Sequence, residues 1–297
     1  MIKKTLYFGN PGYLSLWNSQ IQISMPSRGE KDPPISIPIE DIAYIVLDNN
    51  QITLTQALIA ALLKNDVALI TCDERHMPVG LMLPLDGHSL QSERFIKQIN
   101  ASLPLKKQLW RQTIQAKLAN QAALLKSKGV EVGNMMAWVE DVRSGDTTNL
   151  EARGAVYYWR NIVKEDFIRD RKGDYPNNFF NYGYAILRAI VARALVSSGL
   201  LATLGIHHHN RYNAYCLADD IMEPYRPIVD KLVLEICEET DEEKLTTDIK
   251  KRLLSIPVLD VNIDGHNSPL MVAVANTVSS LVKCFSGEAR YIIYPTL

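Results

Sequence analysis

The stretch Pro84-Leu85-Asp86-Gly87-His88-Ser89 marks the point where the pattern of apolar residues changes along the chain. Before it, short runs rich in β-branched and aromatic residues alternate with polar ones at a period of 2, which is typical of β-strands. After it, apolar residues recur at a period of 3.6, which is typical of helices. Because Pro, Gly and polar residues are typical of loops, we interpret residues 85–92 as a linker between two domains, residues 1–84 and 93–297.

The N-terminal region is predicted to be a small β-rich domain. Strands are expected at 5–8, 13–17, 20–25, 35–39, 42–47, 67–72 and 80–83, with turn residues such as Asn10-Pro11-Gly12 between them. One short helix is expected over residues 55–65, where the side chain of Thr55 can cap the first turn.

The C-terminal region is predicted to be a larger all-α domain, so that the fold class is α+β. Helices are expected at 91–100, 104–128, 131–143, 150–164, 178–198, 216–238, 241–254 and 268–285. Pro224 and Pro227 disfavour a continuous helix, and we expect the segment 216–238 to kink or to begin again there.

Composition excludes several classes of protein. The 297 residues are 47% hydrophobic and 22% charged, as in globular proteins, and the net charge of −1 excludes a partner bound by bulk positive charge alone. The charge is unevenly distributed, however, because residues 92–172 hold 15 basic and 9 acidic residues, a balance of +6. This basic middle region is either a solvated helix surface or a polyanion-binding surface.

Several features favour a cytoplasmic protein with no membrane segment. The four cysteines form no C-x-x-C pair, and the N-terminal residues MIKKTLYFGN contain no apolar signal-peptide core. The most apolar stretch, residues 185–201, carries Arg188 and Arg193 and is interpreted as a buried helix.

Three segments carry residues capable of chemistry. Glu151 lies in Thr148-Asn149-Leu150-Glu151, which on spacing alone is typical of a capping box. His207-His208-His209 is either a solvated loop or a source of one or two metal ligands, since consecutive side chains of an extended segment point to alternate faces. Asp219, Asp220 and Glu223 form either a surface acidic cluster, with Arg226 as counter-ion, or a set of carboxylate ligands.

Together these segments describe one site of carboxylate and imidazole ligands. A site without thiolates suits Mg²⁺ or Mn²⁺ better than structural Zn²⁺. Such an ion can polarise a phosphoryl oxygen and activate a hydroxyl nucleophile. The sequence contains no P-loop, G-x-G-x-x-G or G-x-S-x-G motif that would favour another chemistry.

The segment LGIHHHNRYNAYCLADDIMEPYRPIVD, residues 204–230, resembles the signature region of the CRISPR adaptation integrases of the Cas1 family, most closely their type II branch. The resemblance covers nearly the whole chain. Thr5-Leu6-Tyr7-Phe8, residues 71–78 (TCDERHMP), the Glu151 helix and Asn181-Tyr182-Gly183-Tyr184 occur in the expected order.

The resemblance implies catalytic and metal-binding roles for Glu151, His208 and Glu223, with Asp220 as a supporting acidic residue. His207 and His209 have no counterpart as ligands. Val156 is a departure, because many members carry a basic residue five positions after the catalytic glutamate; Arg153 is a candidate to replace that contact.

The implied protein is a homodimer, with the β-rich domain in dimerisation, that assembles with Cas2 into a heterohexamer and, in type II systems, meets other CRISPR proteins. It would bind double-stranded DNA, both protospacer and CRISPR repeat. It would join 3′-hydroxyl ends of a short foreign duplex to the repeat by metal-dependent transesterification, without a covalent protein–DNA intermediate. The alternatives are a stand-alone metal-dependent nuclease acting on branched DNA and a non-catalytic DNA-binding scaffold.

DNA contacts are expected from the basic middle region, which now becomes the favoured polyanion-binding surface. The candidates are Lys106, Lys107, Arg111, Lys117, Arg153, Arg160, Lys164, Arg169, Arg171 and Lys172. The neighbouring aromatic residues Tyr157, Tyr158 and Trp159 are interpreted as core residues rather than base-stacking platforms.

Overall fold

A computed structural model describes residues 3–26, 33–163 and 166–297 and divides the chain into two compact units. Unit 1 comprises Met1–Gly87 and Leu245–Ser255, and unit 2 comprises His88–Lys244 and Ile256–Leu297. The first crossing, between Gly87 and His88, falls within the predicted linker of residues 85–92. Leu245–Ser255 belongs to unit 1, although the sequence pattern placed these residues in the helical domain.

Within the described residues, unit 1 contains two four-stranded sheets and two short helices, one from each of its chain segments. In the first sheet, β1 (Lys4–Phe8), β5 (Ile42–Leu47) and β7 (Ala68–Cys72) are parallel neighbours, and β8 (Pro78–Met82) pairs antiparallel with β7. In the second, β4 (Ile35–Pro38), β3 (Gln20–Ser24) and β2 (Gly12–Trp17) are antiparallel, and β6 (Ile52–Leu54) runs parallel to β2. A 3₁₀ turn, η1 (Ile39–Asp41), precedes β5.

The core of unit 1 comes from the alternation of apolar residues along these strands. Leu14, Ile21 and Ile45 are fully buried and pack with Leu58 and Leu62 of helix α1 (Gln56–Lys64). The predicted cap of α1 is confirmed, since Thr55 Oγ1 accepts a hydrogen bond from the Leu58 amide at 3.3 Å. The second chain segment of unit 1, Leu245–Ser255, forms helix α9 (Thr247–Leu253).

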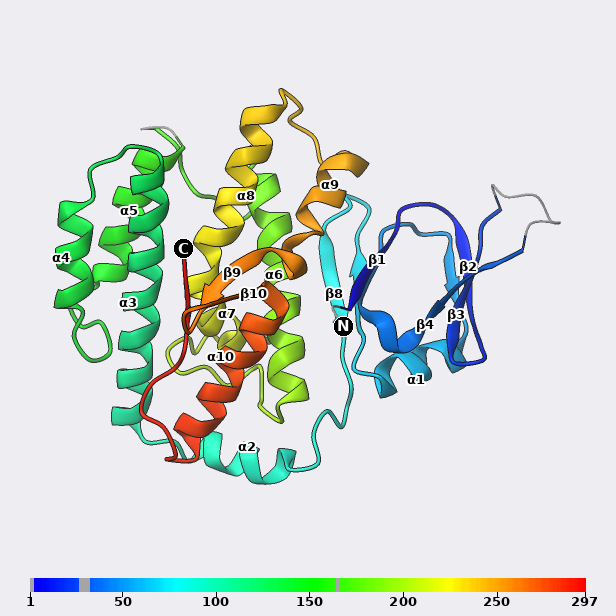
Figure 1. The fold of residues 1–297 in the computed structure, drawn as a ribbon, viewed down its shortest axis with the longest axis horizontal. Helices are drawn as coiled ribbons and strands as arrows, with labels where there is room; N and C mark the ends of the chain where they lie inside the picture. The colour runs from blue at the N-terminus through cyan, green and yellow to red at the C-terminus, as the bar shows by residue number, and fades with distance from the viewer. Residues whose placement is uncertain (1–2, 27–32, 164–165) are drawn as a thin grey trace. The chain divides into compact units, whose positions relative to one another are not determined.

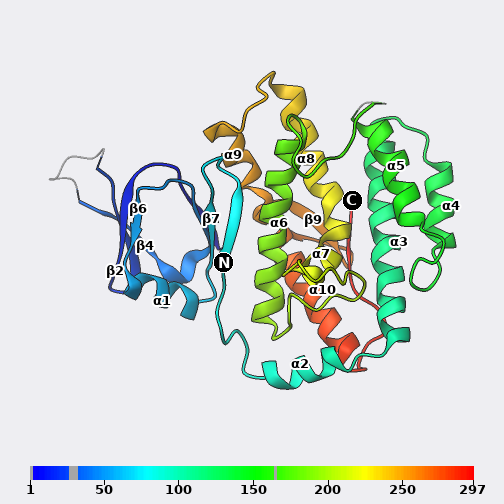
Figure 2. The ribbon, with the colours of Figure 1, turned by 180° about the vertical axis from the view of Figure 1, so that it is seen from behind.

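Unit 2 is built mainly from helices (Figures 1 and 2). They are α2 (Gln91–Ile99), α3 (Leu103–Ser127), α4 (Gly133–Asp141), α5 (Leu150–Ile162), α6 (Asn177–Ser197), α7 (Cys216–Met222), α8 (Arg226–Glu239) and α10 (Leu270–Phe285). The long helix α3 lies beside α4 and α5, while α6 packs against α7, α8 and α10. The predicted fold class, a β-rich N-terminal region followed by a helical C-terminal region, is therefore confirmed.

The expected break in segment 216–238 is present. Helix α7 ends at Met222, the 3₁₀ turn η2 (Glu223–Tyr225) follows, and α8 begins at Arg226. Pro224 is the second residue of η2 and Pro227 is the second residue of α8, so each lies in a first turn, where the missing N–H costs no helical hydrogen bond.

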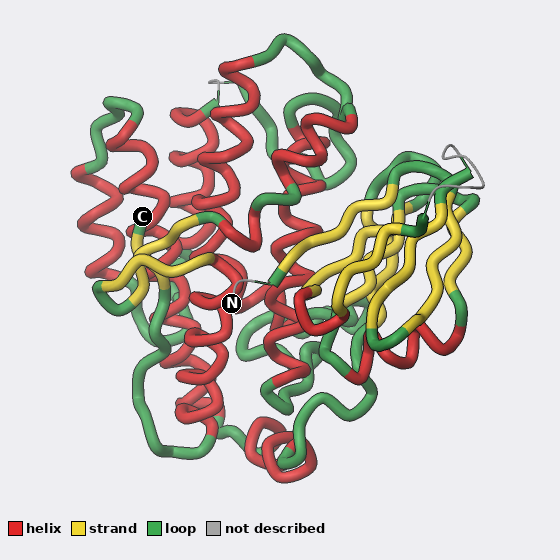
Figure 3. The backbone as a smooth tube through the Cα atoms, turned by 45° about the vertical axis from the view of Figure 1, so that its right-hand side comes forward, coloured by secondary structure: helices red, strands yellow, loops and turns green. Residues whose placement is uncertain are grey.

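Unit 2 also contains a small sheet that the sequence pattern did not predict (yellow in Figure 3). Its strands are β9 (Asp260–Ile263), β10 (His266–Pro269) and β11 (Pro295–Thr296), and the 3₁₀ turn η3 (Ile256–Val258) precedes them. Asp264 and Gly265 join β9 to β10 with φ values of +52° and +77°, so the Asp-Gly pair forms the tight turn that this dipeptide favours. These strands are too short for a period-2 pattern of apolar residues to be recognised in the sequence.

Among the described residues, one helix, α6, is long and apolar enough to cross a membrane by length and composition. Two-thirds (67%) of its most apolar window is buried, however, and the core helix of a soluble protein has the same property. Phe179, Tyr182 and Leu187 are each fully buried, which agrees with the interpretation of this apolar stretch as a buried helix.

Candidate active site

A buried lysine lies between two of the predicted site residues. Lys117 of α3 has a side chain only 8% exposed, and its Nζ lies 2.8 Å from Glu151 Oε1 and 2.6 Å from Glu223 Oε2. Burial acts to lower the pKa of Lys117, but Glu223 and Glu151 outweigh it, so the pKa is raised and the ammonium stays charged. Lys117 is one of the predicted DNA contacts, and the structure instead gives it two carboxylate partners.

Glu223 is the most buried of the predicted ligands, with a side chain 4% exposed. Its second oxygen, Oε1, lies 3.0 Å from the Arg226 guanidinium. Burial acts to raise the pKa of Glu223, but Arg226 and Lys117 outweigh it and hold the pKa below its ordinary value. Asn120 of α3 fixes the turn that carries Glu223, because its Nδ2 donates to the carbonyl oxygen of Pro224 at 2.8 Å.

Glu151 lies in the first turn of α5 and does not cap that helix. Asp146 does so instead, since its two carboxylate oxygens accept hydrogen bonds from the amides of Leu150 (2.9 Å) and Glu151 (3.0 Å). The capping-box interpretation of Thr148 and Glu151 is therefore wrong. With its backbone held by Asp146, the Glu151 side chain points to Lys117.

His208 is held by Asp220, a fully buried residue of α7. His208 Nδ1 lies 2.5 Å from Asp220 Oδ1, and Asp220 Oδ2 accepts from the amides of Ile206 (2.7 Å) and His207 (3.0 Å). This carboxylate hydrogen bond raises the pKa of His208 above its ordinary value, although burial opposes it. A Cβ on Gly205 would lie 2.7 Å from Asp220 Oδ2, so only glycine permits this close approach.

Trp110 supports the histidine segment from α3. The His207 ring stacks on the Trp110 indole, with centroids 4.1 Å apart and an interplanar angle of 1°, and the His208 ring meets the same indole edge-on. Burial against this surface lowers the pKa of His207. The three histidines thus have different environments: His207 is stacked, His208 is bound to Asp220, and His209 is exposed.

The residues fit a divalent cation in kind but are arranged around an ammonium group. Within the described parts of the chain, no three His, Cys, Asp or Glu side chains are positioned to hold a metal ion. Glu223 Oε2 is nevertheless buried and accepts no hydrogen bond, although Lys117 Nζ is close. Asp220 also orders the His208 imidazole through Nδ1, an arrangement found behind metal-ligating histidines. Mg²⁺ or Mn²⁺ would find carboxylate and imidazole ligands here.

Some of the predicted DNA contacts have exposed side chains, and others are partly buried or form hydrogen bonds within the protein. Lys107 and Arg160 are exposed, and Arg153 is exposed with its guanidinium 4.6 Å from the centre of the Trp138 ring. Lys106 and Arg111 of α3 are partly buried, and Lys164 lies outside the described residues. Arg169 is engaged internally, where it donates to Asn177 and Asn181.

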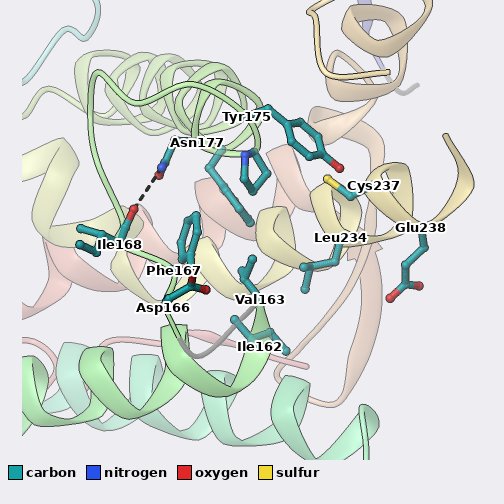
Figure 4. Close-up of a pocket in the computed structure, with 12 residues that line it drawn as sticks. Ile162, Val163, Asp166, Phe167, Ile168, Tyr175, Asn177, Leu234, Cys237 and Glu238 are labelled. Atoms are coloured by element: carbon teal, nitrogen blue, oxygen red, sulfur yellow. Dashed lines mark hydrogen bonds between the residues drawn. The ribbon is translucent and has the colours of Figure 1, made fainter. Parts of the chain in front are cut away.

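A separate pocket of about 600 Å³ lies among α5, α6 and α8 (Figure 4). Apolar side chains, including Phe167 and Leu234, line it, and the hydroxyl of Tyr175 points toward the thiol of Cys237. None of the predicted metal ligands lines this pocket, so it is not part of the candidate active site.

Two solved structures show which known proteins share this fold. A casposase bound to an integration product aligns with a TM-score of 0.78 and 21% identity over 98% of this chain and 92% of the casposase. A CAS1 protein from Thermotoga maritima aligns with a TM-score of 0.77 and 16% identity over 96% of this chain and 98% of that one. At these identities the likeness concerns the fold, which is that of Cas1 and casposase proteins.

Sequence comparison identifies the family. The family model for CRISPR associated protein Cas1 matches residues 6–251. A CRISPR-associated endonuclease Cas1 from Neisseria meningitidis is 35% identical over 283 residues, covering 94% of this chain and 91% of the relative. A second Cas1 endonuclease, from Pyrobaculum aerophilum, is 25% identical over 263 residues, covering 83% of this chain and 88% of the relative. The chain belongs to the Cas1 family.

Proposed function

We propose that this protein is a metal-dependent DNA integrase and endonuclease of CRISPR adaptation. It joins the 3′-hydroxyl ends of a short foreign duplex to the CRISPR repeat by transesterification. The observation that carries the proposal is the convergence of Glu151 and Glu223 on one cationic position, with His208 ordered beside them by Asp220. The names of its relatives support the coarser activity, since two Cas1 relatives are called endonucleases and the structural relative is a casposase.

Mg²⁺ or Mn²⁺ would be held by Glu151, His208 and Glu223. When bound, the ion would polarise the attacked phosphate and lower the cost of deprotonating the DNA 3′-hydroxyl. Asp220 keeps His208 Nδ1 occupied, which leaves Nε2 as the imidazole nitrogen available to a ligand. Arg226 keeps Glu223 ionised, so that this buried carboxylate can act as a ligand at neutral pH.

DNA would be bound mainly through its phosphates, which position a duplex without reading its sequence. Five of the predicted contacts have exposed side chains that can meet a polyanion, namely Lys107, Arg153, Arg160, Arg171 and Lys172. A neighbouring structure is a Cas6-RT-Cas1–Cas2 complex, which supports Cas2 as a partner. We propose a homodimer that assembles with Cas2 into a heterohexamer in the cytoplasm.

Strand transfer into repeat DNA tests the proposal. The purified protein, with Cas2 and a short duplex, should join the duplex to a CRISPR repeat in Mg²⁺ or Mn²⁺ and not in EDTA. His208→Ala and Glu223→Gln should each lower the rate by at least about 10²-fold, as loss of a group that acts in the transition state does. His209→Ala is the matched control, because this neighbouring side chain is exposed and should leave the rate unchanged.

Two outcomes would replace the proposed activity with another. Cleavage of branched DNA that needs neither Cas2 nor a repeat would indicate a stand-alone nuclease. DNA binding with no metal-dependent strand transfer or cleavage would indicate a non-catalytic scaffold.

A further inference from the structure

Glu151 and Glu223 are balanced in charge by two cationic side chains before any metal ion binds. Glu151 and Glu223 supply two negative charges, and Lys117 and Arg226 supply two positive ones within 3.0 Å of the carboxylate oxygens. Lys117 and Glu223 are almost fully buried, so water screens these charges weakly. A divalent ion added to this set would leave two uncompensated positive charges.

Lys117 also occupies the position that a metal ion needs. Its Nζ lies 2.8 Å from Glu151 Oε1 and 2.6 Å from Glu223 Oε2, whereas a Mg²⁺ ion lies about 2.0–2.1 Å from each ligand oxygen. Glu223 cannot turn its other oxygen to the ion freely, because Arg226 holds Oε1. A metal ion that binds Glu223 must therefore displace the ammonium group of Lys117 or the guanidinium of Arg226.

The ammonium is the easier of the two groups to displace. Glu223 Oε2 lies 2.6 Å from Lys117 Nζ and Oε1 lies 3.0 Å from the Arg226 guanidinium, so each oxygen faces one cation. Lys117 has a flexible four-carbon stem, whereas a guanidinium is a rigid planar group. Once displaced, the ammonium needs another anion, since an unpaired buried charge is costly.

We propose that Lys117 is an internal counter-cation that competes with the catalytic metal, so that metal binds tightly only when DNA phosphate is present to accept the displaced charge. The inference rests on the function proposed above. Linkage makes the effect reciprocal: DNA raises the affinity for metal by the same factor by which metal raises the affinity for DNA. Lys117 would thereby keep the free protein from assembling an active metal site.

Metal and DNA affinities of the full-length protein test the proposal without relying on activity. Mn²⁺ binding is followed by electron paramagnetic resonance, and binding of a duplex with dideoxy 3′ ends is followed by fluorescence anisotropy at fixed ionic strength. In the natural protein, the duplex should tighten Mn²⁺ binding at least about 10-fold, and Mn²⁺ should tighten duplex binding by the same factor. Glu223→Gln removes one of the proposed metal ligands, so the Mn²⁺ binding that this variant retains in the presence of the duplex measures the Mn²⁺ bound to the DNA alone.

Lys117→Met removes the charge and keeps an unbranched side chain. This variant should bind Mn²⁺ about 10-fold more tightly than the natural protein in the absence of DNA, and the duplex should add little. Its metal-free melting temperature should fall and should recover when Mn²⁺ is added, because the ion then balances the two carboxylates. Lys117→Gln is a second variant in case the methionine disturbs packing, and Lys128→Met, at the surface pair with Glu238, is the control.

Equal Mn²⁺ affinity in the natural protein and in both Lys117 variants, with the same dependence on DNA, would overturn the inference while leaving the proposed function intact. If instead Glu223→Gln leaves the Mn²⁺ affinity of the natural protein and of the Lys117 variants unchanged, Glu223 is not a metal ligand. The metal site is then refuted and both proposals fail.

Discussion

The two units each bury a lysine, and the two lysines have different surroundings. In unit 1, Lys250 pairs with one carboxylate, Asp48, at 2.8 Å, and Asp48 also accepts from Tyr7 (2.6 Å) and contacts His76 (2.8 Å). In unit 2, Lys117 is shared by two carboxylates, and Glu223 Oε2 accepts no hydrogen bond.

The difference separates a structural ion pair from a site for chemistry. At Asp48, burial acts to raise the carboxyl pKa, but hydrogen bonds from Lys250, Tyr7 and His76 outweigh it, so the pKa is lowered and each oxygen is used. At Lys117, two carboxylates share one ammonium group, and Glu223 Oε2 accepts no hydrogen bond, so this buried acceptor is not fully used. Saturation of the buried acceptor, rather than burial itself, distinguishes the two clusters.

The largest effect is expected when the structural pair is broken. Asp48→Ala should lower the free energy of unfolding by about 3–5 kcal/mol, because it leaves the Lys250 ammonium buried and unpaired. Urea unfolding measures the change. The double variant Asp48→Ala/Lys250→Met should recover much of the loss, since an apolar replacement needs no charge partner. If the free energy of unfolding of Asp48→Ala fell by less than 1 kcal/mol, the Asp48–Lys250 pair would not be the structural ion pair that this comparison requires.

The second cluster should respond in function rather than in stability when its support is changed. Asp220→Asn keeps the side-chain shape but places an amide where His208 or the loop amides need an acceptor. Mn²⁺ affinity and strand transfer should fall 10- to 100-fold, the usual cost of losing such a partner. Titration in the presence of DNA measures it, with Asp219→Asn, whose carboxylate pairs with Arg188, as the matched control. Equal losses in the two variants would contradict this role of Asp220.

A third buried carboxylate, Asp230, sharpens the comparison because hydroxyl groups are its hydrogen-bond partners. It accepts from Tyr158 (2.8 Å) and Tyr184 (2.5 Å). Burial raises its pKa from 3.8 to about 6, against the opposing effect of these hydrogen bonds and of Arg169 and Arg226.

Because the folded-state pKa of Asp230 exceeds the unfolded value, its contribution to stability is complete below about pH 4 and disappears as pH rises through about 6. Between pH 5 and pH 8, the natural protein should lose about 1.4 kcal/mol relative to Asp230→Asn. Urea unfolding of both proteins at the two pH values measures this contribution of Asp230 to the free energy of unfolding. A difference that stayed constant, or that grew in the opposite direction, would show that the carboxylate is ionised throughout.

The smallest effect concerns the helix that delivers Glu151. Asp146→Ala removes the observed cap of α5 and should cost about 1 kcal/mol of stability. Thr148→Ala, the matched control, should change stability by less than half of that, because no cap bond from Thr148 is present. Circular dichroism during thermal unfolding compares them. A larger loss of stability in Thr148→Ala than in Asp146→Ala would instead support the capping box of Thr148 and Glu151.

Much of the fold could be predicted because the hydrophobic period is a strong local signal. The helices of unit 2 and the strands of unit 1 follow the predicted change of period, and the two prolines correctly indicated the break before α8. The sheet of β9, β10 and β11 was missed, since two of its strands have four residues and the third has two. Asp264-Gly265 was the available signal.

The partnerships within the candidate site were harder to predict, because they join distant segments. Glu151, Asp220 and Glu223 could be named from motifs, but nothing local pairs Glu151 with Lys117, 34 positions earlier. A signal did exist along α3: Thr113, Lys117 and Asn120 are polar residues three or four positions apart, and all lie on the buried face. Polar residues at a helical period inside an apolar face indicate a buried network rather than a solvated surface.

The division of unit 1 into two chain segments has a consequence for synthesis of the protein. Asp48 emerges from the ribosome 202 residues before Lys250, the ammonium group that neutralises it. The first 87 residues therefore cannot complete their buried ion pair as an independent N-terminal fragment, and most of unit 2 is already made when Leu245–Ser255 arrives. Because contacts between distant residues form slowly, we expect final consolidation of unit 1 to follow the synthesis of most of unit 2.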